Sequence, residues 1–342
     1  MAEIVTMGEI MLRLSPPEHQ RFIQATSFDI NYGGSEGNIA VCLSNYGHNV
    51  GYITKLPKNE IGECVIATLQ KYGVECSAIT RGGNRLGIYF LENGSSVRPS
   101  SVIYDRAGSS MAESTVDDFD FETILKDIKW FHTSGITPAL NKKVAEATKK
   151  AMIIAKKNGA IISFDLNYRA KLWTKDIDEK QKLIADMMQY VDICFGNARD
   201  AALVLGYKDE NFDFINGDYS ICVNEENMQK IIKKYNFKYL VSSLRESISA
   251  SDNYYSAVVA TKEDVYIGKK FLVHITDRVG SGDAFAAGFI HGLITGKSKE
   301  EALNFAIASS AIKHTIPGDL NFTTIEEVEK LSESNGEGRV VR

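Results

Sequence analysis

Short runs of apolar and β-branched residues alternate along the chain with longer segments in which apolar residues recur every three or four positions. The short runs predict strands, and the longer segments predict helices with one buried face. The predicted strands are residues 3–14, 49–55, 128–132, 160–166, 191–195 and 239–243. The predicted helices are residues 36–46, 61–72, 141–158, 179–190, 198–205, 225–235, 283–294 and 299–315. Strands that alternate with helices are typical of βαβ units, so the sequence predicts an α/β fold with a largely parallel sheet.

One part of the chain interrupts this alternation. Two strand-like runs, 85–91 and 98–106, are separated by the short polar sequence ENGSS, which predicts a hairpin and leaves no room for a crossover helix. Residues near 11–30 are also extended and irregular. We expect a small β-sheet lid over one edge of the main sheet, formed by segments at about 11–33 and 85–107, which can close over an adjacent crevice.

Composition narrows the class of protein. Hydrophobic residues make up 44% of the 342 residues and charged residues 24%, which is typical of a globular protein. The net charge is −5 and no dense basic run occurs, which argues against nucleic acid or an anionic membrane as the main partner. The five cysteines are scattered, the first residues do not resemble a signal peptide, and no stretch reaches the roughly 18 apolar residues of a membrane span. We therefore expect a cytoplasmic protein that does not enter a membrane.

The stretch TDRVGSGDAFAAGF, residues 276–289, stands between a strand-like run and an amphipathic helix. Gly280 and Gly282 allow a sharp turn that exposes backbone N–H groups, and the start of a helix adds partial positive charge, so the pattern predicts an anion site suited to phosphate. The same field would keep Asp283 ionised. An ionised carboxylate beside a phosphate can accept the proton of an alcohol that attacks phosphorus. The alternative is that Asp283 only caps the helix after a tight turn.

A second glycine-rich stretch, NYGGSEGNIA at residues 31–40, also opens a predicted helix. Gly33 and Gly34 would let a polar ligand approach the main chain, and Asn38 offers the donor and the acceptor that hydroxyl recognition requires. The glycine spacing is not that of a dinucleotide-binding fingerprint.

Together, GGSEGNIA and DRVGSGDAFAAGF resemble the two signatures of the ribokinase/PfkB family of carbohydrate kinases, and the resemblance covers about residues 3–320. It implies a three-layer α/β/α core with a mostly parallel sheet and a β-sheet lid. It also implies magnesium-dependent transfer of the γ-phosphoryl group of ATP to a sugar hydroxyl, with Asp283 as the base and Gly280, Ser281 and Gly282 as an anion hole. Residues 1–330 would then form one ribokinase-like catalytic domain, and residues 331–342 a flexible tail.

Two segments bear on which sugar is used. Asp165, Asn167 and Arg169 are spaced by two at the carboxyl end of a predicted strand, so they share a face while the strand persists. On the lid, Tyr104 and Arg106 are likewise spaced by two. Paired arginines from core and lid would suit a carboxylate, because a guanidinium binds one with two parallel hydrogen bonds.

The string FDLNYRAKLW, together with the lid sequence IYDR, resembles the 2-keto-3-deoxygluconate kinases within this family. By position, the resemblance implies sugar-acid contacts at Gly33, Gly34, Asn38, Tyr89, Tyr104, Arg106, Asn167 and Arg169. The alternatives are that Arg169 pairs with an aspartate of the protein and that Tyr104 only packs in its strand.

The nucleotide side departs from the family pattern. Asn197 and Asp200 resemble the Asn-x-x-Glu motif that is linked to magnesium and phosphate, with an aspartate in the last place, so Asp200 would contact the metal directly or through water. Ser243 and Arg245 stand where the family has a threonine and a glycine-bearing loop; Arg245 reaches phosphate or is simply exposed.

The adenine pocket would be lined from the helices that follow. Asn304, Ala308 and His314 fall near the positions that line it in the family, and small side chains such as Ala308 and Ser309 make room for a planar ring. His314 is as well explained as a packed or surface histidine.

These inferences predict an ATP- and Mg²⁺-dependent kinase that phosphorylates the terminal hydroxyl of 2-keto-3-deoxygluconate. One alternative is a related kinase for fructose, ribose or another keto-sugar, in which Arg106 and Arg169 are structural. A second is a sugar- or nucleotide-binding protein on this fold that has lost turnover. We also expect a homodimer or larger oligomer that pairs through the lid.

Overall fold

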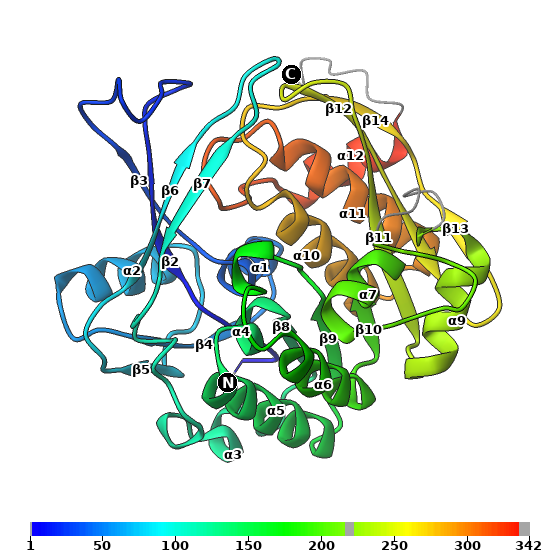
Figure 1. The fold of residues 1–342 in the computed structure, drawn as a ribbon, viewed down its shortest axis with the longest axis horizontal. Helices are drawn as coiled ribbons and strands as arrows, with labels where there is room; N and C mark the ends of the chain where they lie inside the picture. Colours follow the sequence, from blue (N-terminus) through cyan, green and yellow to red (C-terminus); the bar gives the residue numbers. More distant parts are fainter. Residues whose placement is uncertain (1, 216–221, 335–342) are drawn as a thin grey trace.

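The computed structural model of the chain describes residues 2–215 and 222–334 (Figure 1). Its main sheet has ten strands, in the order β13-β12-β11-β10-β9-β8-β1-β4-β5, with β14 also paired to β12. The strands from β11 to β5 run parallel, and β12 is antiparallel to each of its three partners. The predicted α/β fold with a largely parallel sheet is therefore confirmed.

The strands of the main sheet are β1 (Ile4–Met7), β4 (Val50–Leu56), β5 (Ile79–Arg81), β8 (Trp130–Ser134), β9 (Ile161–Asp165), β10 (Ile193–Phe195), β11 (Tyr239–Ser247), β12 (Asp252–Ala260), β13 (Val265–Ile267) and β14 (Phe271–His274). The α-helices are α1 (Ser35–Asn45), α2 (Glu60–Lys71), α3 (Phe121–Ile124), α4 (Ile136–Ala139), α5 (Lys142–Lys157), α6 (Ile177–Met187), α7 (Ala198–Leu205), α9 (Glu225–Tyr235), α10 (Ser281–Ile294), α11 (Lys299–Lys313) and α12 (Ile325–Glu333). The short 3₁₀ helices are η1 (Val116–Asp118), η2 (Ala170–Leu172) and η3 (Met188–Tyr190).

Helices cover both faces of this sheet and form two separate apolar cores. Helices α3 to α7 and α9 pack on one face, and α1, α2, α10, α11 and α12 pack on the other. Successive strand residues point to opposite faces, so the neighbours Trp130 and Phe131 of β8 enter different cores. Burial on both faces explains why the central strands are apolar at nearly every position.

A separate four-stranded sheet forms the lid, in the order β3-β2-β6-β7. Its strands are β2 (Met11–Ser15), β3 (Asp29–Gly33), β6 (Gly87–Glu92) and β7 (Ser101–Asp105). β6 and β7 form the predicted antiparallel hairpin, and β2 pairs with both β3 and β6. Figure 1 shows this sheet projecting beside the helical layers.

The elements of the structure differ from the predicted ones in several places. The strand expected over 3–14 is two strands in two sheets, because the chain leaves β1 at Met7 and enters the lid at Met11. The long strand β12 was not predicted. Of the tail expected over residues 331–342, residues 331–333 continue α12 to Glu333, and residues 335–342 lie outside the described residues. Within residues 2–215 and 222–334, none of the helices combines the length and the apolar character that a bilayer crossing needs.

Candidate active site

A cavity of about 560 Å³ lies where the carboxyl ends of β9, β10 and β11 meet the lid and the first turns of α1 and α10. This is the edge at which open α/β sheets bind ligands. Most of the site residues expected from the sequence line it. They are Gly33, Gly34, Asn38, Tyr89, Tyr104, Arg106, Asn167, Arg169, Asn197, Asp200, Ser243, Arg245, Gly280, Ser281, Gly282 and Asp283.

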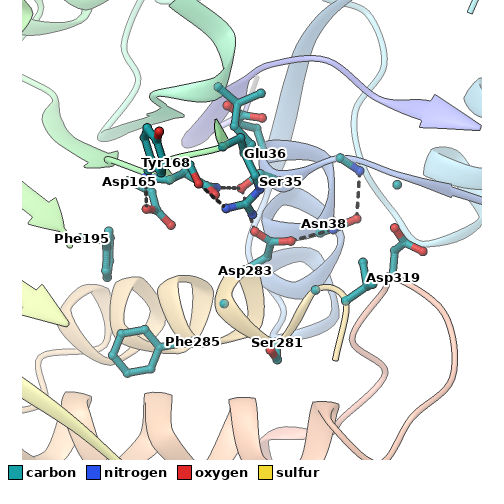
Figure 2. A pocket seen from close by; sticks show the side chains of 18 of the residues that line it. Ser35, Glu36, Asn38, Asp165, Tyr168, Phe195, Ser281, Asp283, Phe285 and Asp319 are labelled. Atoms are coloured by element: carbon teal, nitrogen blue, oxygen red, sulfur yellow. Dashed lines mark hydrogen bonds between the residues drawn. The ribbon is translucent and has the colours of Figure 1, made fainter. Parts of the chain in front are cut away.

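The Asp283 carboxylate is held by two side chains from the start of α1 (Figure 2). The Ser35 hydroxyl donates to Oδ1 at 2.7 Å, and the Asn38 amide donates to Oδ2 at 2.7 Å. Ser35 in turn accepts a hydrogen bond of 3.0 Å from the Asn167 amide. Residues from two distant parts of the chain therefore fix the Asp283 carboxylate at the cavity wall.

The environment of Asp283 differs from the sequence expectation. Removal from water by the surrounding protein raises the pKa of Asp283 above its usual value, although the hydrogen bonds from Asn38 and Ser35 act in the opposite direction. The sequence argument had assumed that the field of the helix dominates, and it does not. A raised pKa makes the carboxylate a stronger base, provided that it is ionised.

The glycines of the N-terminal motif serve packing within the protein. A Cβ atom on Gly33 would lie 2.3 Å from the Asp319 carboxylate, and one on Gly34 would lie 2.0 Å from the main-chain oxygen of Glu9. Asn38 uses its amide oxygen to accept from the Gly34 N–H at 3.2 Å and its amide nitrogen to bind Asp283. The structure thus shows Asn38 positioning the carboxylate, a role that the sequence argument did not consider.

The turn before α10 lines the cavity with Gly280, Ser281 and Gly282. Gly280 adopts φ 77°, a left-handed conformation that favours glycine, and the amides of the following first turn have no acceptor within the helix. Arg245 donates to the Ser281 hydroxyl at 3.4 Å, and Arg278 also lines the cavity. Burial and the neighbouring Arg245 lower the pKa of Arg278. Two guanidinium groups beside a helix N-terminus fit a phosphate group.

Asn197 and Asp200 form a capping box at the start of α7. The Asn197 side chain accepts from the Asp200 N–H at 3.1 Å, and the Asp200 carboxylate accepts from the Asn197 N–H at 3.1 Å. This reciprocal pair explains the two side chains by local helix chemistry alone. Asp200 nevertheless lines the cavity, and burial raises its pKa.

The acidic side chains present do not make a complete metal site. Among residues 2–215 and 222–334, no group of three His, Cys, Asp or Glu side chains is placed to hold an ion. Mg²⁺ commonly takes one or two protein carboxylates and fills its remaining positions with water and substrate phosphates. Asp200 beside the phosphate-compatible turn fits that arrangement.

The segment after β9 does not continue as a strand. β9 ends at Asp165, whose carboxylate accepts from the Asn167 N–H at 2.9 Å, and Asn167 adopts φ 41°. Asp165 therefore reaches the cavity from the end of β9, whereas Asn167 and Arg169 reach it from the segment after the strand, and the three do not share one strand face as expected. Burial, with a further contribution from the Asp283 charge, raises the pKa of Asp165 to about 7.

On the lid, the predicted contact residues have protein partners. The Glu9 carboxylate accepts from Arg106 Nε at 2.9 Å and also from its Nη2, and from the Ser109 hydroxyl. The Tyr89 hydroxyl donates to Asp319. Tyr104 lies opposite Tyr89 in the sheet, with the ring centroids 6.0 Å apart.

The structure places Ala308 and His314 in the protein interior, away from the large cavity. Ala308 is fully buried in the core, and His314 is buried with Nδ1 2.7 Å from the Ser310 main-chain oxygen, so its ring is packed. Asn304 accepts from the Lys269 N–H and donates to the Tyr266 hydroxyl. None of these three residues lines the large cavity.

Among the charged residues that line the cavity, sequence reasoning missed four: Glu9, Glu36, Arg278 and Asp319. Glu36 stands inside the GGSEGN motif and is 1% exposed; it accepts from the Ser134 N–H at 3.0 Å and the Thr137 hydroxyl at 2.8 Å. Arg278 could have been found as the basic residue two positions before Gly280. The sequence around Glu9 and Asp319 does not indicate that they belong to the site, because their partners lie far away in the chain.

Known proteins resemble the chain over nearly its whole length. A model of the pfkB family of carbohydrate kinases matches residues 1–325. The 2-dehydro-3-deoxygalactonokinase of Haloferax volcanii is 33% identical over 330 residues, covering 96% of each chain. The 5-dehydro-2-deoxygluconokinase of Clostridium perfringens is 30% identical, covering 96% of this chain and 92% of the relative. The crystal structure of 2-dehydro-3-deoxygluconokinase from Thermotoga maritima has a TM-score of 0.90 and 45% identity, covering 97% of this chain and 98% of that one.

The family match agrees with the geometry of the cavity. A buried carboxylate, a helix N-terminus flanked by two arginines, and a β-sheet lid meet in one place at the carboxyl ends of parallel strands. The chain therefore belongs to the pfkB family of carbohydrate kinases.

Proposed function

We propose that this protein transfers the γ-phosphoryl group of ATP to the terminal hydroxyl of 2-keto-3-deoxygluconate, also called 2-dehydro-3-deoxygluconate, and so forms the 6-phosphate. The observation that carries the proposal is the placement of Arg106 from the lid and Arg169 from the core in the cavity that contains Asp283. A neutral sugar offers no reason for two such arginines. The names of the Haloferax and Thermotoga relatives support the same substrate class.

Arg106 keeps binding capacity despite its pairing with Glu9. Glu9 occupies Nε and Nη2, and a guanidinium has five N–H donors. The pairing fixes the plane of the group, which lowers the entropy lost when a substrate carboxylate binds. Arg169 donates to the Tyr168 main-chain oxygen at 3.1 Å and is otherwise exposed at the cavity.

Asp283 accepts the proton of the sugar hydroxyl as that oxygen attacks the γ-phosphorus, and the bond from this phosphorus to the β–γ bridging oxygen breaks so that ADP leaves. Ser35 and Asn38 hold the carboxylate in place, and the amides after Gly280, with Arg245 and Arg278, stabilise negative charge on the phosphoryl group. When bound, ATP supplies that group and Mg²⁺ neutralises phosphate charge. The lid excludes water from the site.

We place the nucleotide base in a smaller cavity of about 300 Å³ that shares Arg245 with the first. Residues of β11, β12 and β13 line it, together with Gly268. A Cβ atom on Gly268 would lie 2.9 Å from the Asn304 amide oxygen and 2.4 Å from Ile307. Asn304, which the sequence assigned to the adenine pocket, would then lie next to the base, behind Gly268.

We also infer one catalytic domain over residues 1–330 and a cytoplasmic location. ATP is the phosphoryl donor, and all five cysteines are free of disulfide bonds, as expected in a reducing compartment.

The decisive experiment is ADP release in a coupled assay with ATP and Mg²⁺ fixed. The substrates compared are 2-keto-3-deoxygluconate, its galactonate-derived epimer, 5-dehydro-2-deoxygluconate, fructose, ribose and a blank without sugar. Preference for 2-keto-3-deoxygluconate supports the proposal. Preference for fructose or ribose would refute the carboxylate contacts. If none of the sugars led to ADP release, the result would favour the alternative of a binding protein that has lost turnover.

Replacing Arg169 by lysine is expected to raise KM for the sugar acid by about 10- to 100-fold, because an ammonium cannot form the paired hydrogen bonds of a guanidinium. KM for ATP should change little. Steady-state kinetics with each substrate varied in turn measures both values. The matched control is Arg199→Lys on α7, an exposed arginine outside the cavity. Equal changes in KM for the sugar acid and KM for ATP would show that Arg169 interacts with the acidic residues around it and does not bind the substrate carboxylate.

We further propose that the lid pairs with a second copy of the chain. Its two outer strands, β3 and β7, each have one edge without a partner strand in the lid sheet. Apolar side chains are exposed on and beside these strands, with Ile30 62% and Ile103 52% exposed. Sedimentation velocity should give a dimer or larger species, and the Ile30→Lys, Ile103→Lys variant should shift it to monomer. A monomeric unmodified protein at micromolar concentration would contradict this.

A further inference from the structure

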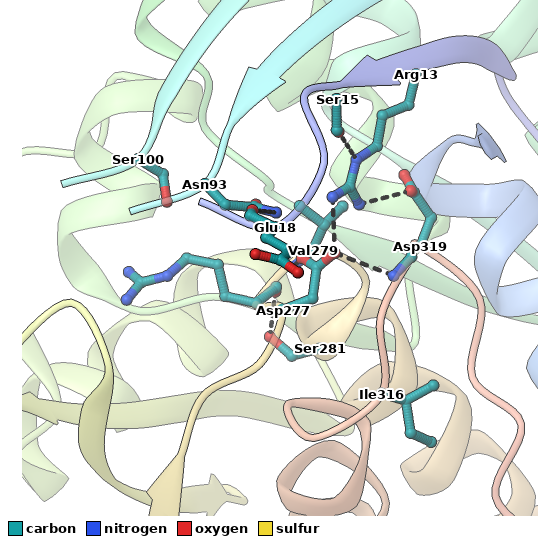
Figure 3. Close-up of polar contacts among 12 residues, drawn as sticks. Arg13, Ser15, Glu18, Asn93, Ser100, Asp277, Val279, Ser281, Ile316 and Asp319 are labelled. Atoms are coloured by element: carbon teal, nitrogen blue, oxygen red, sulfur yellow. Dashed lines mark hydrogen bonds and ion pairs between the residues drawn. The ribbon is translucent and has the colours of Figure 1, made fainter. Parts of the chain in front are cut away.

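Arg13 lies in the middle of lid strand β2 and is only 2% exposed. Its guanidinium contacts three side chains (Figure 3). Nε donates to the Ser15 hydroxyl at 2.7 Å, Nη1 donates to Asp319 at 2.9 Å, and Nη2 donates to Asp277 at 2.7 Å. An arginine buried in a small lid sheet is therefore bound to two carboxylates outside that sheet.

Asp277 connects this arginine to the turn before α10. Its Oδ1 accepts from the Val279 N–H at 3.0 Å, and its Oδ2 accepts from the Gly318 N–H at 3.0 Å as well as from Arg13. Val279 directly precedes Gly280, where the left-handed turn begins. The Asp277 side chain thus fixes the path of the chain into the anion-binding turn.

Asp319 connects Arg13 to the same turn from the other side. Its main-chain oxygen is so close to Gly280 that a Cβ atom there would lie 1.9 Å away. Its carboxylate binds Arg13 and Tyr89, both residues of the lid, and packs against Gly33. Lys313 holds this loop by donating to the main-chain oxygens of Ile316 and Gly318 at 3.0 and 2.8 Å.

The cluster is balanced in charge and closed to solvent. Arg13 and Lys313 carry two positive charges against the two negative charges of Asp277 and Asp319, and all four residues are at most 4% exposed. Arg13 and Asp277 do not line the large cavity, so they cannot contact a sugar or a phosphate there. A buried ion pair gives little net stability compared with apolar packing, but it fixes geometry.

We propose that Arg13 is a positioning residue that couples the lid sheet to the anion-binding turn. One guanidinium holds the two aspartates that shape the turn, so the sugar side and the phosphate side of the site are aligned through Arg13. This inference rests on the proposed kinase function for its kinetic consequences. The coupling itself is a property of the ligand-free protein.

The test is Arg13→Lys, because lysine keeps the charge but cannot bind both aspartates with the fork of a guanidinium. We expect kcat to fall at least about 10-fold, since small misplacements of catalytic groups cost that much or more. KM for the sugar acid should stay within about threefold, because the residues expected to bind it are unchanged. The control is Arg98→Lys, a lid arginine that pairs with Glu92 and the His19 main-chain oxygen away from the cavity.

A second readout needs no substrate. Hydrogen–deuterium exchange should be at least about tenfold faster for the amides of residues 279–284 in Arg13→Lys than in the unmodified protein, and unchanged in Arg98→Lys. Unchanged exchange, or a changed KM with kcat intact, would overturn the proposal. If Arg13→Lys fails to fold, Ser15→Ala, which removes only the hydrogen bond to Nε, should shift exchange in the same direction and by less. If the unmodified protein phosphorylates no sugar acid, the proposed function fails while the exchange experiment still tests the coupling.

Discussion

Replacing Asp283 by asparagine is expected to lower kcat by about 10²- to 10⁴-fold, the usual contribution of a general base. The fold should survive, because an asparagine oxygen can accept from Asn38 while its amide donates to the Ser35 hydroxyl. Isothermal titration should therefore show sugar and ATP binding close to that of the unmodified protein. Coupled ADP release measures the loss of turnover.

The matched control is Asp105→Asn, a lid aspartate that is paired with Arg85 and lies outside the cavity. It should leave kcat unchanged. Turnover of Asp283→Asn near the unmodified rate would show that another group takes the proton. Asp165, which also lines the cavity, would then be the next carboxylate to replace.

The pH dependence follows from the direction of the Asp283 shift. The surroundings raise its pKa, so the carboxylate becomes protonated, and inactive as a base, at a higher pH than an exposed aspartate would. kcat/KM should fall as the pH drops through this raised value. The residual activity of Asp283→Asn should lack this acidic limb. An identical limb in the variant would assign the titration to a different group.

The second large effect is expected for Gly280→Ala. Alanine at φ 77° is strained, and its Cβ would lie 1.9 Å from the main-chain oxygen of Asp319. Main-chain atoms cannot rotate away, so the loop around Asp319 must move. We expect a loss of about 2 kcal/mol or more in the free energy of unfolding, measured by urea denaturation, together with a large loss of kcat.

The control for this prediction is Gly282→Ala, two residues further into the same turn. No atom lies within 4 Å of a Cβ built there, and its φ is not in the left-handed region. Alanine also favours helix over glycine by roughly 0.5 to 1 kcal/mol. Gly282→Ala should therefore be as stable as the unmodified protein or slightly more stable. Equal stability of the two variants would contradict the close approach at Gly280.

Much of the sequence interpretation rested on local patterns of residue types. The alternation of apolar runs and helical segments predicted the layered α/β fold, since burial on both sheet faces produces that pattern directly. The glycine turn at 280–282 and Asp283 were found because a strand, a turn and a helix follow one another within a few residues. Signals of this kind need no knowledge of the rest of the chain.

The missed features depend on partners far away in the sequence. Arg13 and Asp319 are 306 positions apart, and each looks like an ordinary polar residue in its own segment. The reason for glycine at position 33 is the Asp319 carboxylate, which no local argument could supply. Asn167 was placed on a strand because the turn formed by the Asp165 side chain is not visible from the alternation of residue types. Ala308 was assigned to a ligand pocket because its side chain is small, but a small side chain is equally suited to a packed core, and the structure buries it there.

The contact between Arg13 and Asp319 also bears on how the protein is made on the ribosome. Asp319 is synthesised 306 residues after Arg13. Until then the lid lacks one carboxylate partner and the turn at Gly280 lacks the loop that packs against it. A chain that terminates before residue 319 therefore cannot assemble the site, and such incomplete products should release no ADP in the cell.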